Sequence, residues 1–401
     1  MEAIIPEMSP SRLRTCQIIT SFNYKSAATV RCYRTAALLA GRGYEVLLIT
    51  GREFLPHPHW DLSRFKVVQI SSMVKPVSPA NDLAALLRLY LTFIKWRPAV
   101  VHTHLAKAGI LGRLAGRLAG VPRLVHTVHG PSFPDNLPGL KRTFFRLLEK
   151  CCAPFTHRFV FVGDNLRQEY VDAGVCPPSR ALVIRSCRPE KEYEAAFRVT
   201  SKKLALLRKS LVPDNECFII GYVGRLVPCK NLDQAAGVAH LLRRRGINAH
   251  LVFIGETDPP GDKAYEDFLK HRVVELGLKD CVHFTGYRED VLTLMRAMDA
   301  LILTSSYEGL PNVAAEAGIL GKLLVSYDVG GIKELFEDGQ TAFIVPRGDI
   351  RALADRLSYV AAHPEAAQRM GEAAAPKIKA LFQSPRWEEE KLQLYRSLLN
   401  S

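Results

Sequence analysis

Short apolar runs rich in β-branched residues alternate with helical patterns along the whole chain, and this alternation constrains the fold more than any other feature. The first half contains the runs QIITSF, EVLLIT, FKVVQI, AVVHTH, RLVHTVH, RFVFVG and ALVIR. The second half contains FIIGYVG, AHLVFIG, VHFTGY, ALILTSS, LLVSYD and AFIVP. Strands that alternate with helices are typical of parallel sheets joined by crossover helices. The sequence therefore predicts an α/β protein built from doubly wound sheets.

The length of 401 residues exceeds what one hydrophobic core usually supports, so we expect two domains. Residues 186–212 are charged and lack strand periodicity, which places the hinge there. We predict a first domain over 1–190 and a second over 205–383. Residues 384–401 form a separate amphipathic helix that Ser384 caps and Pro385 begins.

Composition favours a folded, enzyme-like protein, because 48% of the residues are hydrophobic and only 23% are charged. The nine cysteines include no C-x-x-C pair, which indicates a reduced, cytoplasmic protein. The first residues, MEAIIPEMSPSRLRT, do not resemble a signal peptide. No run approaches the ~18 to 20 apolar residues that would cross a bilayer. We expect a soluble or peripheral protein.

The formal net charge of +14 calls for an anionic partner. Nucleic acid is not expected, because the chain has no recognisable binding module and its three Trp residues form no stacking array with basic residues. Phosphorylated substrates and an anionic membrane face fit better.

Residues 141–159, KRTFFRLLEKCCAPFTHRF, combine basic and apolar groups at helical spacing. This pattern is typical of an interfacial helix, and it predicts peripheral membrane contact through a basic surface that includes Lys141, Arg142 and Arg146. The simpler interpretation is an ordinary amphipathic helix that packs a face of Phe144, Leu147 and Leu148 into the core.

The segment 301–316, LILTSSYEGLPNVAAE, carries two carboxylates eight positions apart. Pro311 suits the first turn of a helix, so Glu308 lies on a loop at the carboxyl end of a strand and Glu316 in the second helical turn. The helix rises about 7.5 Å between Pro311 and Glu316. This separation suits contacts to two ends of one extended ligand, and the helix N-terminus between them favours an anion.

The pattern S-x-x-E-G-x-P-x-x-x-x-E-A resembles the retaining nucleotide-sugar glycosyltransferases of family 4, which have the GT-B fold. Three further segments are similar to that family: GYVGRLVPCKNLD (221–233), DVGGIKELFEDGQTAFIVPRGD (328–349) and VHTHLAKAGILGRLAGRLAGVPRLVHTVHG (101–130). The resemblance covers nearly the whole chain. It implies two Rossmann-like domains that face each other across a cleft, with the C-terminal helix crossing back to the first domain.

Arg225 and Lys230 follow an apolar strand and can place two cations on one anion. The resemblance implies that they bind the diphosphate of the donor and oppose the charge that grows on the leaving group, with no cofactor and no metal. It also implies that Glu316 binds the ribose and Glu308 the sugar. The intervening donor contacts are Gly309, Leu310 and Pro311, and the donor is a UDP- or GDP-sugar.

His129 ends a strand at the edge where open α/β sheets bind ligands. Its counterpart in similar transferases touches the donor sugar, so we assign catalytic roles to His129, Glu308, Arg225 and Lys230. His102, His104 and His126 are interpreted as structural, because no acidic or cysteine ligand accompanies them as in a metal site.

The acceptor site is weakly marked, with Lys25, Ser26 and Lys107 as candidates near Gly109. The family's Gly-Gly turn after the first strand is replaced by SFNYKSAATVRCYR, and its Asn/Ser-Gly turn after the last strand of the first domain by Ser186-Cys187. An alternative function is therefore a nucleotide-sugar-binding module without transfer activity. A glycosidase would use the two glutamates as acid and nucleophile, but it would explain neither the two cations nor the two domains.

The sequence thus predicts a retaining, metal-independent glycosyltransferase that moves a hexose-like sugar to an acceptor hydroxyl. The expected acceptor is a saccharide or a lipid-linked molecule, in the assembly of a surface polysaccharide or glycolipid. The expected location is the cytoplasm or the inner face of the cell membrane.

Overall fold

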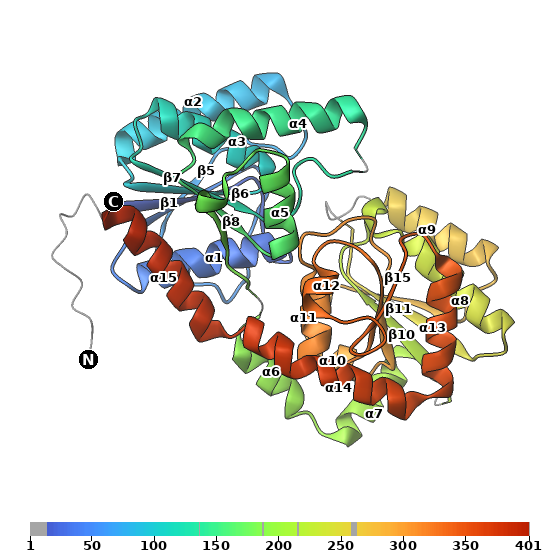
Figure 1. Ribbon diagram of the computed structural model, residues 1–401. Helices are drawn as coiled ribbons and strands as arrows, with labels where there is room; N and C mark the ends of the chain where they lie inside the picture. The colour runs from blue at the N-terminus through green and yellow to red at the C-terminus, as the bar shows by residue number, and fades with distance from the viewer. Residues whose placement is uncertain (1–13, 136, 187, 215, 258–262, 401) are drawn as a thin grey trace. The chain divides into compact units, whose positions relative to one another are not determined.

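The computed structural model describes residues 14–135, 137–186, 188–214, 216–257 and 263–400, which form two compact units (Figure 1). The first unit comprises residues 1–186 and 385–401, and the second comprises residues 187–384. Both are built on a parallel sheet covered by helices, which confirms the predicted α/β class.

The first unit contains a seven-stranded sheet in the order β5-β3-β1-β6-β7-β8-β9. Its strands are β1 (Arg14–Ile19), β3 (Glu45–Thr50), β5 (Lys66–Gln69), β6 (Val100–His104), β7 (Arg123–Val128), β8 (Arg158–Phe161) and β9 (Ala181–Val183). Its helices are α1 (Ala27–Ala40), α2 (Pro79–Trp96), α3 (Ala106–Leu118), α4 (Gly139–Cys152), α5 (Asp164–Asp172) and α15 (Ser384–Asn400). A small sheet pairs β2 (Phe22–Asn23) with β4 (Phe54–Leu55).

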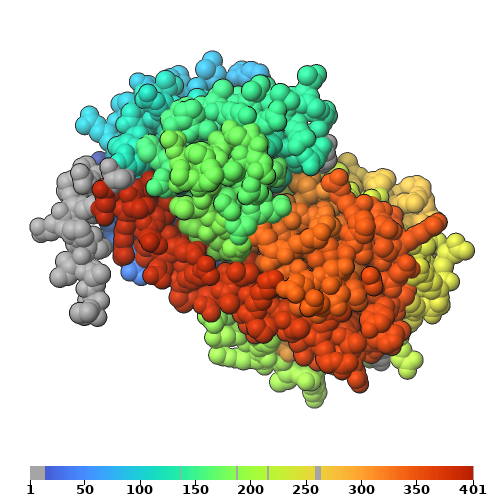
Figure 2. Space-filling model, viewed as in Figure 1, coloured from blue at the N-terminus to red at the C-terminus, as the bar shows by residue number. Residues whose placement is uncertain are grey.

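Helices bury both faces of this sheet. One core joins β-strand residues such as Ile19 and Val125 to α1 and to Trp387 and Tyr395 of α15. The other core joins the opposite face to α2 and α3. The resemblance implied that the last helix belongs with the first domain, and the structure places it there, with its outer side on the surface (Figure 2).

The second unit contains a six-stranded sheet in the order β12-β11-β10-β13-β14-β15. Its strands are β10 (Phe218–Val223), β11 (Ala249–Ile254), β12 (Val282–Gly286), β13 (Ala300–Leu303), β14 (Leu324–Tyr327) and β15 (Phe343–Val345). Its helices are α6 (Glu190–Phe197), α7 (Ser201–Leu211), α8 (Leu232–Arg244), α9 (Ala264–Glu275), α10 (Val291–Arg296), α11 (Asn312–Ile319), α12 (Ile332–Leu335), α13 (Ile350–Ala362) and α14 (Pro364–Leu381).

The strand order reverses between β10 and β13 in the second unit, and between β1 and β6 in the first. Loops that leave the carboxyl ends of two such strands turn in opposite directions and open a crevice, which is where open α/β sheets bind ligands. The fold therefore directs attention to the loops after β10 and β13, and to those after β1 and β6.

The stretch 186–212, in which the hinge was proposed, contains α6 and α7, and the second unit begins at residue 187. Tyr193 and Ala196 are the buried residues of α6. One local prediction was wrong. The helix proposed over 141–159 ends at Cys152, and its residues Phe144 and Leu147 are 52% and 54% exposed. The buried face of α4 instead contains Glu149, which bonds to Arg113 of α3.

Candidate active site

Hydrogen bonds tie together the two loops at the switch point of the second unit. The backbone N–H of Ser306, after β13, donates to the carbonyl of Cys229, after β10, over 2.8 Å. The Thr304 hydroxyl donates to the carbonyl of Lys230 over 2.8 Å, and the Asn231 amide donates to the carbonyl of Thr304 over 3.0 Å. The loop that carries the predicted diphosphate ligands is therefore held against the loop that carries Glu308.

The glycine-rich segment that follows β14 supports the Glu308 loop from another side. Gly330 has a φ of 51°, and a Cβ there would lie 2.4 Å from the carbonyl oxygen of Glu308. The N–H of Gly331 donates to the carbonyl of Gly309 over 2.9 Å. Only glycine permits this approach of backbone to backbone, which explains the glycine at position 330.

Lys230 and Glu308, predicted to bind two different parts of the donor, form an ion pair with each other. The distance from Lys230 Nζ to Glu308 Oε1 is 2.5 Å, and the Ser305 hydroxyl donates to the same carboxylate oxygen over 2.7 Å. The two side chains are 15% and 13% exposed. An anion that binds Lys230 must therefore compete with Glu308 for the ammonium group.

Arg225 lies on the exposed part of the loop after β10. Its carbonyl accepts a hydrogen bond from the Tyr222 hydroxyl over 2.9 Å, which fixes the start of the loop. Burial raises the pKa of Tyr307 to about 12, and the positive charge of Arg225 opposes that shift.

Helix α11 carries Glu316 and begins at Asn312, with Pro311 at the preceding N-cap position rather than in the first turn. Gly309, Leu310 and Pro311 are all buried, so the chain between the two glutamates is packed into the unit. Glu316 itself is 5% exposed.

No sequence pattern predicted the partner of Glu316, which is Arg188. The guanidinium Nε donates to Glu316 Oε1 over 2.8 Å, and Nη1 donates to Glu192 over 3.1 Å. The carboxylate of Glu316 raises the pKa of Arg188. A carboxylate offers about four acceptor sites, so this bond orients Glu316 and leaves capacity for ligand hydroxyls. The only signal for Arg188 was its position beside the departure at Ser186-Cys187.

His129 follows β7 in the first unit and lines a cavity of about 220 Å³ together with Leu105, Ala106, His126, Val128 and Pro131. Burial lowers the pKa of His129 well below its usual range, so the imidazole is neutral. Leu105 has a φ of 68° and a ψ of 156°, a strained backbone conformation for a residue with a side chain. Strain of this kind concentrates at functional sites.

The three histidines interpreted as structural are fully buried and neutral, because burial lowers the pKa of each. His102 bonds to Thr127, His104 to Gln17, and His126 to Thr103. Across the parts of the chain that the structure describes, no group of three or more His, Cys, Asp or Glu side chains is placed to hold a metal ion. Independence of metal remains a prediction.

The three acceptor candidates lie after β1 and β6. The Lys107 ammonium donates to Asp82 of α2 over 2.6 Å and to the carbonyl of Pro76, so it is held at the end of α2. The N–H of Lys25 donates to the side-chain oxygen of Asn23 over 3.1 Å, and Ser26 is the N-cap of α1. Asn23 thus closes a turn that similar transferases make with two glycines.

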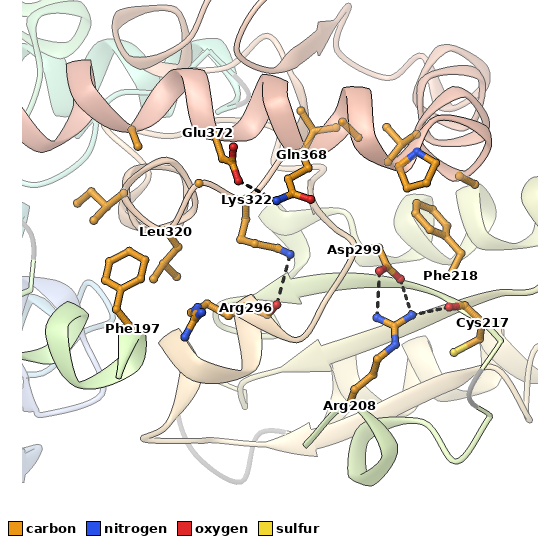
Figure 3. Close-up of a pocket in the computed structure, with 18 of the residues that line it drawn as sticks. Phe197, Arg208, Cys217, Phe218, Arg296, Asp299, Leu320, Lys322, Gln368 and Glu372 are labelled. Atoms are coloured by element: carbon orange, nitrogen blue, oxygen red, sulfur yellow. Dashed lines mark hydrogen bonds and ion pairs between the residues drawn. The ribbon is translucent and has the colours of Figure 1, made fainter. Parts of the chain in front are cut away.

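A larger cavity, of about 820 Å³, lies at the opposite, amino-terminal edge of the second unit's sheet (Figure 3). Two of its charged side chains have partners within the unit: Arg208 bonds to Asp299 over 2.7 Å, and the Lys322 ammonium donates to the carbonyl of Arg296 over 3.3 Å. None of the predicted site residues lines this cavity. The loops after β10 and β13 therefore remain the candidate site.

Comparison with known proteins agrees with the fold. The family model described as Glycosyl transferases group 1 matches residues 205–377, and the model described as Glycosyltransferase Family 4 matches residues 28–187. The chain is 23% identical over 334 residues to the capsular polysaccharide biosynthesis glycosyltransferase CapM of Staphylococcus aureus, covering 83% of this chain and 86% of CapM. It is 28% identical over 295 residues to an Escherichia coli UDP-Gal:alpha-D-GlcNAc-diphosphoundecaprenol alpha-1,3-galactosyltransferase, covering 73% of each chain.

Solved structures of other proteins share the fold. The crystal structure of HepE from Anabaena in complex with UDP-glucose has a TM-score of 0.79 at 19% identity, covering 96% of this chain and 99% of HepE. WaaG, a glycosyltransferase involved in lipopolysaccharide biosynthesis, has a TM-score of 0.75 at 15% identity, covering 94% of this chain and 98% of WaaG.

The two parallel α/β units of this chain have the GT-B fold that HepE and WaaG share. With family models matching both units, the chain belongs to glycosyltransferase family 4, as the sequence resemblance indicated.

Proposed function

We propose that the protein is a retaining, metal-independent transferase that moves a hexose-like sugar from a nucleotide diphosphate sugar to an acceptor hydroxyl. The observation that carries this proposal is the convergence of Arg225, Lys230, Glu308 and Glu316 on loops and a helix at one sheet edge of the second unit. The sugar end and the nucleotide end of the donor are assigned to Glu308 and Glu316, and the diphosphate to the two cations.

In the proposed reaction, the bond from the anomeric carbon to the diphosphate breaks, and the acceptor oxygen attacks from the same face. The departing diphosphate takes the acceptor's proton, and Arg225 and Lys230 stabilise its growing negative charge. Lys230 exchanges its ion pair with Glu308 for one with the diphosphate. Glu308 is then available to a sugar whose anomeric carbon gains positive charge.

A UDP-sugar is the proposed donor, and a lipid-linked saccharide the proposed acceptor. Support comes from the relatives, because the Escherichia coli protein is named for a UDP-galactose donor and a diphosphoundecaprenol acceptor, and HepE was solved with UDP-glucose. CapM and WaaG are named for capsular polysaccharide and lipopolysaccharide biosynthesis, which supports a role in surface polysaccharide or glycolipid assembly.

We also propose that the first unit contacts an anionic membrane surface. Helix α4 exposes Leu140, Phe144 and Leu147, and α2 exposes a stripe of Leu83, Leu87, Leu91 and Ile94. Both helices contact α3 and lie on the same side of the sheet (Figure 1). Apolar side chains exposed beside Lys141, Arg142 and Arg146 are typical of an interfacial surface. No helix among the described residues is long and apolar enough to span a bilayer.

Donor hydrolysis by the purified protein tests the proposal. UDP-glucose, UDP-galactose and a GDP-sugar are first screened for thermal stabilisation, where a ligand at 100 times its Kd contributes about 2.7 kcal/mol. Slow release of nucleotide diphosphate indicates a transferase, and tight binding without release indicates the alternative, a binding module.

Variants then test the proposed roles. Lys230→Ala should reduce release about 10²- to 10³-fold, because it removes an electrostatic contact to the leaving group. The matched control is Lys333→Ala, because the Lys333 side chain is 65% exposed and its ammonium pairs with Asp328. Wild-type turnover in Lys230→Ala, or activity that EDTA abolishes and a divalent cation restores, would contradict the proposed mechanism.

A further inference from the structure

A continuous chain of hydrogen bonds runs through the first unit from the C-terminal helix to His129. The links are Tyr395 Oη to His102 Nδ1 at 2.7 Å, Tyr395 Oη to Gln17 Nε2 at 2.6 Å, Gln17 Oε1 to His104 Nε2 at 3.0 Å, and His104 Nδ1 to His129 Nε2 at 3.0 Å. A last bond joins His102 Nε2 to Thr127 Oγ1 at 2.6 Å. Four elements contribute to it: β1, β6, β7 with the residue that follows it, and α15.

Backbone register explains why these side chains meet. Gln17 of β1 pairs with His102 of β6, and His104 pairs with Thr127 of β7. Side chains two residues apart on a strand share a face of the sheet, so His102 and His104 both face α15. Tyr395 is fully buried in the core between that face and α15.

The direction of each bond follows from the orientation of the Gln17 amide. The Nε2 group of Gln17 donates to Tyr395, so the Tyr395 hydroxyl proton is free to go to His102 Nδ1. The Oε1 atom of Gln17 can only accept, so His104 must carry its proton on Nε2. His104 Nδ1 is then an acceptor, and His129 must donate to it from Nε2.

The His129 end of this series of hydrogen bonds gives an independent argument that His129 donates from Nε2. His129 Nδ1 is buried and has no hydrogen-bond partner among the described residues. A buried N–H without a partner is rarer in proteins than an acceptor without one, so a bare Nδ1 is favoured over a protonated one. Because burial keeps His129 neutral, a proton on Nε2 leaves Nδ1 as a lone-pair acceptor.

We propose that Gln17 and Tyr395 are positioning residues that fix His129 as the Nε2–H tautomer, so that its bare Nδ1 accepts a hydrogen bond from a hydroxyl of the bound sugar. The second half of this statement rests on the proposed function and on the role that the family resemblance assigns to His129, and the first half does not. The C-terminal helix thereby gains a role at the reaction site, because it supplies the hydroxyl that orients Gln17.

Nitrogen-15 NMR of histidine-labelled protein measures the tautomer directly and needs no substrate. The His129 signals are assigned by their loss in His129→Asn. In the wild type, His129 should show a protonated Nε2 and an unprotonated Nδ1. Tyr395→Phe removes the bond that orients Gln17, so His129 should become a mixture of tautomers. The matched control is Tyr44→Phe, because the Tyr44 ring packs edge-on against Tyr395 at 6.3 Å but its hydroxyl is outside the chain of bonds.

Gln17→Glu provides a second test that does not depend on Tyr395→Phe folding. A carboxylate at position 17 accepts from both neighbours, so Tyr395 must donate to it and His102 must donate to Tyr395. His102 should therefore change to the Nδ1–H tautomer, while His129 remains Nε2–H. A wild-type His129 protonated on Nδ1, or a His129 tautomer identical in Tyr395→Phe and wild type, would overturn the proposal.

Kinetics separate this proposal from the proposed function. With the donor that is hydrolysed, Tyr395→Phe should lower kcat roughly 2- to 10-fold with a smaller change in KM, as expected for one neutral hydrogen bond, and Gln17→Glu should retain more activity. A tautomer that changes without any change in kcat would refute the assigned contact of His129 with the sugar, while the positioning by Gln17 and Tyr395 would stand.

Discussion

Replacing Glu316 or Glu308 by glutamine should affect the affinity for UDP in different ways. The test is a titration of each variant with UDP alone. Glutamine keeps the shape of the side chain, which matters because Glu316 is 5% exposed and holds Arg188 over 2.8 Å. Alanine at position 316 would leave the Arg188 guanidinium without this partner. A loss of UDP affinity could then come from a folding defect as well as from a lost ligand contact.

The expected magnitudes follow from the contacts. Glu316→Gln removes the charge that accepts from the ribose hydroxyls, so the Kd for UDP should rise about 10- to 150-fold, corresponding to a charged hydrogen bond of about 1.5–3 kcal/mol. Glu308→Gln should leave UDP binding unchanged or make it up to about 10-fold tighter. The reason is the ion pair at 2.5 Å, which withholds Lys230 from the diphosphate until Glu308 is neutralised.

Calorimetry with UDP and hydrolysis of the intact donor together decide the assignment. Glu308→Gln should lower turnover about 10²- to 10³-fold although it binds UDP at least as well as the wild type. Glu365→Gln is a suitable control, because that side chain is 90% exposed on α14. Equal losses of UDP affinity in both variants would show that the carboxylates do not divide the ligand in this way, and no loss in Glu316→Gln would make its role structural.

Three further outcomes are expected. The ion pair of Arg113 with Glu149 is fully buried at 2.7 Å, so Glu149→Leu should lower the free energy of unfolding by about 3–5 kcal/mol in urea titrations, and a loss below about 1 kcal/mol would contradict this. Burial lowers the pKa of Lys391 from 10.5 to about 7, so the unfolded state binds more protons between pH 7 and 10. Stability should therefore rise with pH across that window, and Lys391→Met should remove the rise. Binding to anionic vesicles should weaken with salt, and roughly 10-fold with Phe144→Ser or Leu87→Ser; equal binding to neutral vesicles would exclude the membrane proposal.

Much of the architecture was predictable because local patterns determine it. The apolar runs predicted the strands, and their alternation with helices predicted parallel sheets, because each strand must be buried on both faces. The spacing of Glu308 and Glu316 placed one on a loop and the other on a helix, since Pro311 permits a helix only after it. The failure was also local. Phe144 and Leu147 were interpreted as a core-facing side of their helix, but both side chains are exposed.

Tertiary structure alone determined which side chains share a site. Lys230 and Glu308 are 78 residues apart and form an ion pair because the strand order brings β10 beside β13. Arg188 reaches Glu316 across 128 residues, and Gln17 reaches Tyr395 across 378. No periodicity encodes such pairs, because they depend on strand order and on which face of the sheet a helix covers. The sequence by itself determined the elements and the family, and it predicted which residues bind a donor, whereas the pairing of those side chains arose only when the chain folded.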